Sequence, residues 1–450
     1  MLHRGVTSAV ESPGSRGQPP PTFLILTAAI GSGHEAAGQA ARDEHERAGH
    51  SALVIDGLRP MSPTLERLLR RGHSGQLRHA PWLWGLFFAL LGCRPVYASV
   101  RGLVGVLYAR RLARLIAPYD PCLIVSTYPL VTAALGRLRR TGRLRAPVVA
   151  LISDYGVHPL WVAPGVDLHL VASRASVELA ERAGGRARMT HLPTDPRFRA
   201  PTPRPMARAR LGIPPAAYAT LIVGGAWGVG DLEGAACCAL AAGTHAIVVT
   251  GHNTALRRRL AERFGADERV SLLGWTEDMP GLMRASDCVI QNAGGMTCVE
   301  ALTIGLPIVF FKPIPGHGRL NARIMQQTGA VHSVGSAEEL TTLLDAMRRG
   351  TAALPRPRHE AAPALGTLLA ALPGTAQVRD LAGTFRRGEV LAATRIVVCA
   401  TLALMIVPGV GVTGVRDIVR DLGGWVHPVS LLMGSIAFAH ALITRTLKLF

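Results

Sequence analysis

The sequence predicts an α/β protein with two Rossmann-like domains that face each other across a cleft. Two observations support this fold class. Short runs of apolar and β-branched residues alternate with helical stretches, and the pattern stops at a proline-rich segment and then starts again. Because open parallel sheets bind ligands at the carboxyl ends of their strands, we expect the site in the cleft between the domains.

The strands expected in the first domain are short apolar runs of the kind that parallel sheets bury. They are TFLILTAA (22–29), ALVIDG (52–57), PCLIVST (121–127), PVVALISD (147–154) and DLHLVAS (167–173), with a helix from about His34 to Ala48. Those of the second domain are YATLIVGG (218–225), HAIVVTGHN (245–253), RVSLLGW (269–275), DCVIQNAGG (287–295) and PIVFFKP (307–313).

Composition shifts divide the chain further. We expect a disordered N-terminus (1–21), a first domain (22–199), a proline-rich linker (200–215), a second domain (216–355), helices that close the second domain (356–388) and an apolar membrane-associated segment (389–450). Residues 1–20 have no apolar core of signal-peptide length, so we expect the protein in the cytosol or on the cytosolic face of a membrane.

The formal net charge of +19 rests almost entirely on arginine, since Lys312 and Lys448 are the only lysines. An anionic partner is one explanation, and a GC-rich coding sequence is the other. Anionic lipid and phosphate esters fit better than nucleic acid, because no zinc-finger, basic-zipper or RNP-like pattern is present. The seven cysteines form no C-x-x-C pair, so neither a disulfide nor a metal site is expected.

Three apolar segments suggest contact with a membrane. PWLWGLFFALLG (81–92), inside an insert over 59–118, is too short to span a bilayer, but aromatic residues followed by arginines suit an interfacial helix. A buried core helix remains the alternative. Residues 390–412 and 425–444 approach spanning length and have basic residues outside their ends, as in a hairpin with both ends in the cytosol. Buried or interfacial helices remain the alternative there.

Glycine loops follow three of the expected strands. The first, IGSGH (30–34), places His34 where a loop becomes a helix, and a side chain with a near-neutral pKa can accept a proton from a hydroxyl there. The second, GGAWGVGD (224–231), suggests a phosphate cradle. In the third, NAGGMTCVE (292–300), the spacing of Thr297 and Glu300 favours a helix-capping box, although Glu300 could also bind the hydroxyls of a ribose.

The ordered set IGSGH, SDYGVHPLWV, GGAWGVG, VVTGHN, LGWTEDMPGLMRASDCVI and NAGGMTCVEALTIGLPIVFFKPIPGHGRLNA resembles the monogalactosyldiacylglycerol synthases and processive diacylglycerol glucosyltransferases. A more distant resemblance is to the peptidoglycan GlcNAc transferase that acts on a lipid-linked acceptor. The match covers residues 23–334. It implies the GT-B fold and inverting transfer of a hexose (galactose, glucose or GlcNAc) from a UDP-sugar to a hydroxyl of diacylglycerol or a related membrane lipid, with no metal or other cofactor.

The resemblance also implies roles for single residues. On the acceptor side it suggests His34 or the rival Asp154 as the catalytic base, with Gly31, Gly33, His158 and Trp161 binding the acceptor. On the donor side it suggests nucleotide-sugar contacts from Gly225, Gly228, Asn253, Met279, Gly294, Gly295, Thr297, Glu300, His317 and Asn321. Glu300 is expected to bind the ribose.

Two departures from the family pattern bear on activity. Relatives of the galactolipid type read PGQE where this chain reads PGHG, so His317 and Gly318 replace a Gln and a Glu near the donor sugar. Trp227 stands where relatives are usually acidic or polar. Three alternatives therefore stay open: a polyprenyl-linked acceptor, epimerisation of the UDP-sugar, and a catalytically silent scaffold that binds nucleotide-sugar or lipid.

Overall fold

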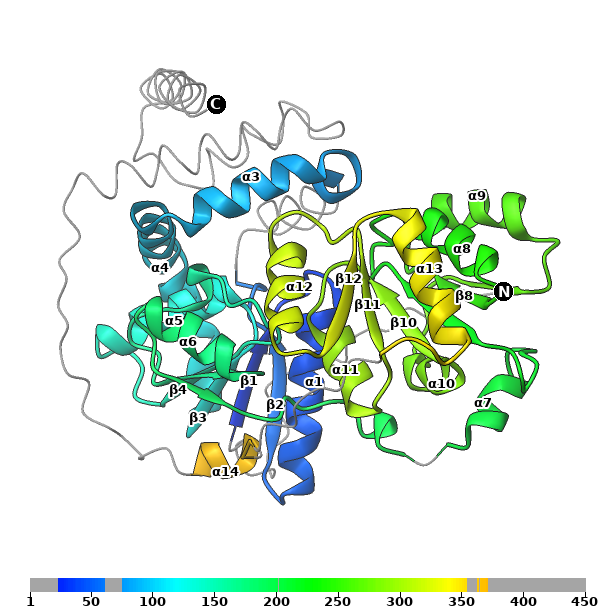
Figure 1. Cartoon of the computed structure of the whole chain (residues 1–450). Coiled ribbons are helices and arrows are strands. Elements are labelled where there is room, and N and C mark those ends of the chain that lie inside the picture. The colour runs from blue at the N-terminus through cyan, green and yellow to red at the C-terminus, as the bar shows by residue number, and fades with distance from the viewer. Residues whose placement is uncertain (1–22, 61–74, 201, 354–361, 364, 371–450) are drawn as a thin grey trace, which may run out of the picture.

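The computed structural model describes residues 23–60, 75–200, 202–353, 362–363 and 365–370. Two parallel sheets of six strands each form the centres of two domains, with helices on their faces (Figure 1). The expected α/β class and the pair of Rossmann-like domains are confirmed. The apolar segments 390–412 and 425–444 lie outside the described residues, as does the N-terminus 1–21.

The first sheet has the order β2-β1-β3-β4-β5-β6. Its strands are β1 (Phe23–Thr27), β2 (Ala52–Asp56), β3 (Leu123–Ser126), β4 (Val148–Leu151), β5 (Leu168–Val171) and β6 (Ala187–Met189). Ile25 in β1 is paired with Val54 on one side and Val125 on the other. The helices are α1 (Ser32–Arg47), α5 (Pro129–Arg140) and α6 (Arg174–Arg182). Chain order reverses around β1, so the loop after β1 opens at the topological switch point.

The second sheet repeats this arrangement in the order β12-β11-β10-β7-β8-β9. Its strands are β7 (Ala219–Val223), β8 (His245–Val249), β9 (Val270–Leu273), β10 (Cys288–Gln291), β11 (Ile308–Phe311) and β12 (Val331–Val334). The helices are α8 (Leu232–Ala241), α9 (Thr254–Phe264), α10 (Met279–Ala285), α11 (Met296–Thr303), α12 (His317–Gln327) and α13 (Ala337–Arg348). Here the switch point lies between β7 and β10, at the second and third glycine loops.

The described part of the insert forms two helices, α3 (Pro81–Gly92) and α4 (Arg94–Ile116). Helix α4 packs on α5 closely enough that a Cβ added to Gly105 would lie 2.8 Å from the Arg137 side chain. No single helix among the described residues is long and apolar enough to cross a membrane. One pair, which bends by 86° between Pro81–Gly92 and Val96–Tyr119, passes that test by length and composition.

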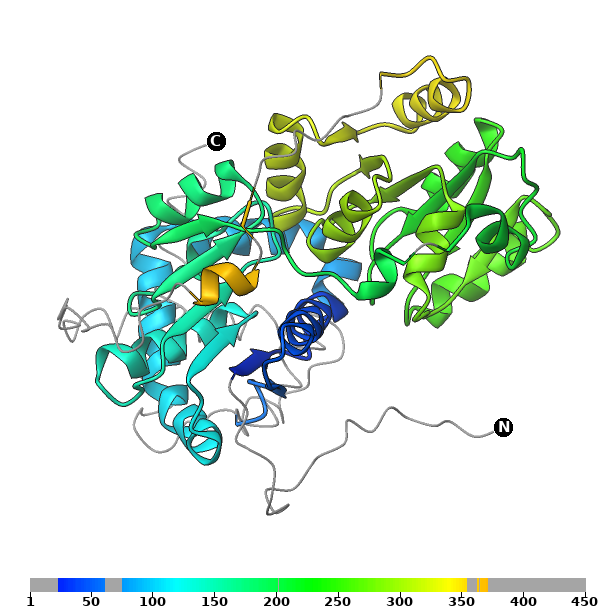
Figure 2. The same ribbon diagram turned by 90° about the horizontal axis from the view of Figure 1, so that it is seen from below.

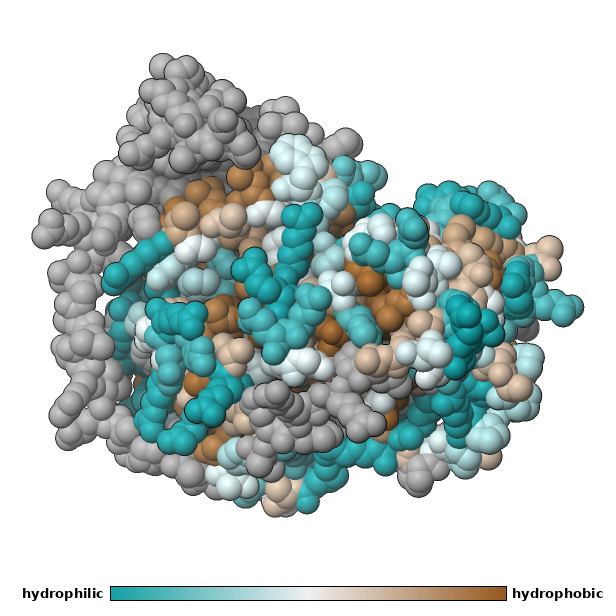
Figure 3. Space-filling model, in the orientation of Figure 1, coloured by the Kyte–Doolittle hydropathy of each residue, from teal (hydrophilic) through white to brown (hydrophobic). Residues whose placement is uncertain are grey.

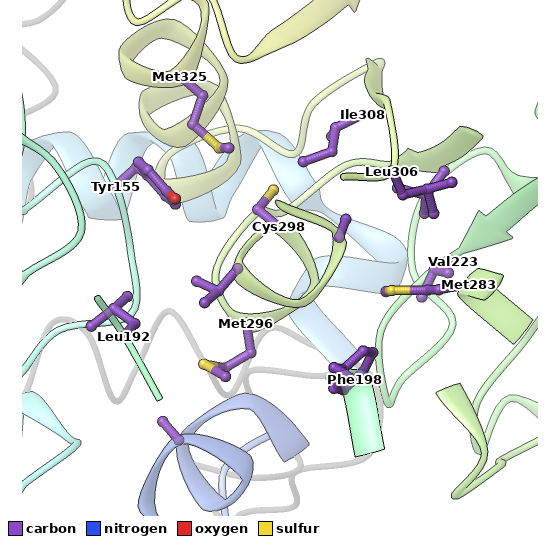
Figure 4. Close-up of a cluster of buried hydrophobic side chains, with 14 of the residues drawn as sticks. Tyr155, Leu192, Phe198, Val223, Met283, Met296, Cys298, Leu306, Ile308 and Met325 are labelled. Atoms are coloured by element: carbon purple, nitrogen blue, oxygen red, sulfur yellow. The ribbon is translucent and has the colours of Figure 1, made fainter. Parts of the chain in front are cut away.

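The two domains share a continuous apolar contact. In Figure 4, Tyr155 and Leu192 of the first domain and Phe198 beside it lie around Met296 and Cys298 of the second. All five side chains are buried. Burial of this kind across a domain boundary holds the two sheets in one relative orientation and encloses the cleft between them.

Two segments behave differently from the sequence-based expectation. The linker 200–215 contains a short helix, α7 (Arg204–Ala209), and Arg208 donates to the Asp287 carboxylate at 2.6 Å, so the linker is packed on the second domain. Helix α14 (Leu365–Ala370), which was expected to close the second domain, lies beside α1 of the first domain (Figures 1 and 2). Thr190 donates to the carbonyl of Pro363 at 3.0 Å, which fixes this crossing.

Candidate active site

A large cleft lies where the carboxyl ends of the two sheets meet, and its volume is about 1410 Å³. The first domain contributes the loop after β1, the segment after β4 and one face of α3. The second domain contributes the loops after β7 and β10 and the start of α12. Both topological switch points therefore open into one cavity, as expected for a pair of doubly wound sheets.

His34 lies in the first turn of α1, after Gly31, whose φ of 72° is readily adopted only by glycine. The imidazole is flanked by Tyr128 at 5.1 Å and Trp161 at 5.6 Å between ring centroids. Its Nδ1 is buried and has no hydrogen-bond partner among the described residues. Burial lowers the pKa of His34, and the charge of Asp154 acts in the opposite direction. A neutral imidazole facing the cleft can accept a proton.

Asp154 follows β4 and lies at the contact between the domains. Its Oδ1 accepts a hydrogen bond of 3.0 Å from Asn321, whose Nδ2 also donates to the carbonyl of Ala293 at 2.8 Å. The Asn321 oxygen accepts from the Gly156 amide at 2.7 Å. Asn321 is fully buried and is not part of the cleft surface. Its amide thus joins the two domains and orients Asp154, and the structure shows this contact where a nucleotide contact was expected.

His158 and Trp161 occupy the segment after Asp154. His158 caps the short helix η2 (Pro159–Trp161), with Nδ1 accepting from the Leu160 amide at 3.2 Å. Its Nε2 lies 3.1 Å from the carbonyl of Phe88 in α3 and donates to it, because Nδ1 carries no proton. Both nitrogens are therefore engaged within the protein. This ring attaches α3 to the first domain, while Trp161 forms part of the cleft wall beside His34.

Two glycines of the second glycine loop differ in whether they line the cleft. Gly225 lines the cleft, whereas Gly228 lies behind it, where an added Cβ would be 2.2 Å from the Thr250 carbonyl. Asn253 caps α9 by accepting from the Leu256 amide and donates to the Gly228 carbonyl at 3.1 Å. Gly228 and Asn253 therefore shape the loop from behind. Met279, at the start of α10, lines the cleft.

The third loop leads directly into α11. Gly294 and Gly295 both have positive φ, 94° and 65°, and Gly295 is the N-cap residue. The helix therefore begins before Thr297, and no side chain caps it. The capping box predicted for Thr297 and Glu300 is wrong, because the two glycines start the helix early. Both residues line the cleft instead, beside a helix N-terminus that no side chain caps, and such a terminus favours negative charge.

Glu300 is half-buried in the cleft wall. Burial raises the pKa of its carboxyl group to about 8, and the negative charge of Asp195 adds to the effect. At neutral pH the group is therefore mostly an uncharged carboxylic acid, and a small change in its surroundings is enough to ionise it. The position is consistent with the ribose-binding role expected from the resemblance.

Some cleft residues were not predicted from the sequence. His252 and Trp275 stack face to face with ring centroids 4.5 Å apart, at a cleft wall built from the ends of β8 and β9. Trp84, in α3, donates its indole N–H to Nδ1 of His317 at 3.0 Å. The aromatic PWLW pattern marked this helix for a membrane and gave no sign of a contact with the second domain. His317 itself lines the cleft as expected.

Comparisons with known proteins agree with this geometry. Residues 34–188 match the family described as monogalactosyldiacylglycerol (MGDG) synthase, and residues 239–354 match glycosyl transferases group 1. The chain is a glycosyltransferase. The resemblance to the MGDG synthases and processive diacylglycerol glucosyltransferases is confirmed, and the two domains around their cleft have the expected GT-B arrangement.

Individual proteins and solved structures are similar to this chain. The glycosyltransferase is 27% identical over 325 residues to the processive diacylglycerol beta-glucosyltransferase of Bacillus subtilis (strain 168), covering 70% of this chain and 84% of that one. The Bacillus pumilus protein of the same name is 26% identical, with 71% and 84% covered. Among solved structures, Anabaena HepE in complex with UDP-glucose is 19% identical, with a TM-score of 0.46 over 73% of this chain and 90% of that one.

Proposed function

We propose that this glycosyltransferase moves a hexose from a UDP-sugar to the hydroxyl of diacylglycerol or a related membrane lipid, with inversion at the anomeric carbon. The observation that carries the proposal is the shared cleft. A buried neutral histidine and a carboxylate line its first-domain wall, and glycine-rich loops with a helix N-terminus line the opposite wall. This places a base for the acceptor opposite an anion site for the donor diphosphate.

The chemistry assigned to the first wall is proton removal. His34 or Asp154 takes the proton from the acceptor hydroxyl while that oxygen bonds to the anomeric carbon, and the bond from that carbon to the diphosphate oxygen breaks. UDP leaves with the electron pair. His34 is the better candidate, because its ring is held between two aromatic side chains, whereas Oδ1 of Asp154 already accepts a hydrogen bond from Asn321.

The charge that develops on the diphosphate is assigned to the second wall. Backbone N–H groups at Gly225 and at the start of α11 can donate to phosphate oxygens, and the helix dipole favours negative charge there. Among the described residues no three His, Cys, Asp or Glu side chains are arranged to hold a metal. We assign leaving-group stabilisation to the backbone N–H groups at Gly225 and at the start of α11.

Access to a lipid acceptor is assigned to the outer face of α3. Trp82 and Leu86 are 68% and 54% exposed, and Figure 3 shows apolar surface over this helix. Val106 and Leu107 of α4 are also exposed, with Arg110 and Arg111 one helical turn further along. Apolar side chains beside arginines suit a headgroup region that contains anionic lipid. We propose that this face holds the enzyme on the cytosolic surface of a membrane.

Product formation tests the proposal. Membranes that contain the enzyme are offered diacylglycerol with UDP-glucose, UDP-galactose or UDP-GlcNAc, and the glycolipid is identified by mass spectrometry. We expect product from one donor, and loss of at least about 100-fold in kcat with His34→Ala, the ordinary effect of removing a general base. His191→Ala, which removes an exposed histidine of the same domain, is the matched control.

Failure has distinct forms. UDP-sugar binding without any glycolipid would favour a polyprenyl-linked acceptor, or the catalytically silent scaffold suggested by the PGHG sequence. Interconversion of the UDP-sugar in the absence of lipid would favour an epimerase. Undiminished product with both His34→Ala and Asp154→Ala would contradict the assignment of the base.

A further inference from the structure

Helix α3 has two different faces. Its outer face carries the exposed side chains Trp82 and Leu86. Its inner face packs on the second domain at the loop before α12: a Cβ added to Gly85 would lie 2.7 Å from the Pro315 Cβ, and one added to Gly316 would lie 2.9 Å from Phe88. A helix of the first domain is thus in contact with the second domain at the wall of the cleft.

The polar contact of this inner face is the hydrogen bond from Trp84 to His317. An indole nitrogen can only donate, so Nδ1 of His317 is the acceptor in the 3.0 Å contact. A neutral imidazole whose Nδ1 accepts must carry its proton on Nε2. The contact with Trp84 therefore selects one of the two neutral tautomers of His317.

His317 is the first residue of α12 and lines the cleft. Two titratable groups of the first domain face it: Asp154, whose charge raises the pKa of His317, and His34, whose own pKa His317 lowers. Burial lowers the pKa of His317 and outweighs Asp154, which keeps the ring neutral. Within the described part of the chain, no protein group accepts a hydrogen bond from its Nε2.

We propose that Trp84 is a positioning residue, which fixes His317 as the Nε2–H tautomer so that this N–H donates to an oxygen of the bound UDP-hexose. The inference rests on the proposed function for the identity of the ligand. It assigns to the membrane-facing helix a part in building the donor site: the outer face contacts lipid and the inner face sets the tautomer of a donor-site residue.

Trp84→Phe tests this by keeping an aromatic ring and removing the N–H. Loss of one neutral hydrogen bond corresponds to a factor of roughly five to ten in affinity. We therefore expect KM for the UDP-hexose to rise by about that factor, with a smaller change in kcat. Tyr119→Phe, which likewise removes one polar hydrogen from an aromatic side chain but lies outside the cleft lining, should leave both constants unchanged.

A double-mutant cycle separates positioning from general packing. Glutamine at position 317 has its own amide N–H and no tautomer to fix, so Trp84→Phe should add little to the KM of His317→Gln. Additive effects in the cycle, or an unchanged KM in Trp84→Phe, would overturn the inference.

The tautomer itself can be observed without destabilising the fold. Nitrogen-15 NMR of histidine-labelled protein, with the His317 signal assigned by its loss in His317→Gln, should show a protonated Nε2 and an unprotonated Nδ1. The opposite pattern would overturn the inference.

Binding measurements separate a failure of this inference from a failure of the proposed function. If the wild type forms no glycolipid, calorimetric affinities for UDP-hexose and for UDP are measured on the same variants. Weaker binding of UDP-hexose by Trp84→Phe would support the inference with a different acceptor, and the UDP measurement shows whether the hexose or the diphosphate is contacted. A wild type that binds no UDP-hexose would overturn both proposals.

Discussion

Glu300 gives the most quantitative prediction. Its carboxyl group has a folded-state pKa of about 8 against an ordinary value of 4.5. The folded protein therefore holds the proton more tightly than the unfolded chain, and stability is lost as the pH rises from 4.5 through 8. At pH 7, about 2.5 units above the ordinary pKa, ionisation of this carboxyl group in the unfolded chain lowers the free energy of unfolding by about 3 kcal/mol. Glu300→Gln, which resembles the neutral acid, should recover that free energy of unfolding.

Urea unfolding of both proteins between pH 4.5 and 8 measures this effect. We expect the variant to gain up to about 3 kcal/mol at pH 7 and almost nothing at pH 4.5, while losing affinity for UDP. Glu262→Gln, which changes an exposed residue of α9, should show no comparable gain. A difference between wild type and Glu300→Gln that does not vary with pH would refute the reasoning.

Three further predictions concern the cleft and its surroundings. UDP affinity should rise by about fivefold between pH 7 and 8, because ribose hydroxyls bind the ionised Glu300, whose population rises by that factor. Calorimetry that shows no pH dependence would contradict this. Asn321→Ala removes the amide that joins Asp154, Gly156 and Ala293. In urea titration the free energy of unfolding should fall by about 1–3 kcal/mol, and in the product assay kcat should fall with it. An unchanged kcat would argue against the orienting role. The double substitution of Trp82→Ser and Leu86→Ser should reduce the amount of enzyme that sediments with vesicles containing anionic lipid, while the affinity for UDP stays constant. Undiminished vesicle binding would place the membrane contact elsewhere.

The sequence was informative about the strands that carry strong apolar runs. β7 is buried along its whole length and β1 is buried from Leu24 onward, and their apolar pattern predicts both directly. The edge strands β6 and β12 were missed, because an edge strand needs less apolar surface and Ala187–Met189 has only three residues. Helix α14 was expected on the second domain and packs on α1 of the first, since a local sequence pattern does not determine which surface a helix covers.

The site was partly predictable for a similar reason. Glycines after strands and His34 at a helix start are local features, and both lie in the cleft. The domain-bridging amide of Asn321 and the bond from Trp84 to His317 join positions 167 and 233 residues apart. Such contacts follow from how the two domains dock. The capping box failed because the positive φ of Gly295 moved the start of α11, a choice that the T-x-x-E spacing does not encode.

The central claim is that this cleft transfers a hexose to a lipid hydroxyl, and the most direct measurement is glycolipid formation by the enzyme on diacylglycerol-containing membranes supplied with each UDP-hexose. We expect one β-linked glycolipid and release of UDP in equal amount, both abolished by His34→Ala and kept by His191→Ala. Enzyme that binds UDP-hexose and yet forms no glycolipid with any donor would contradict it.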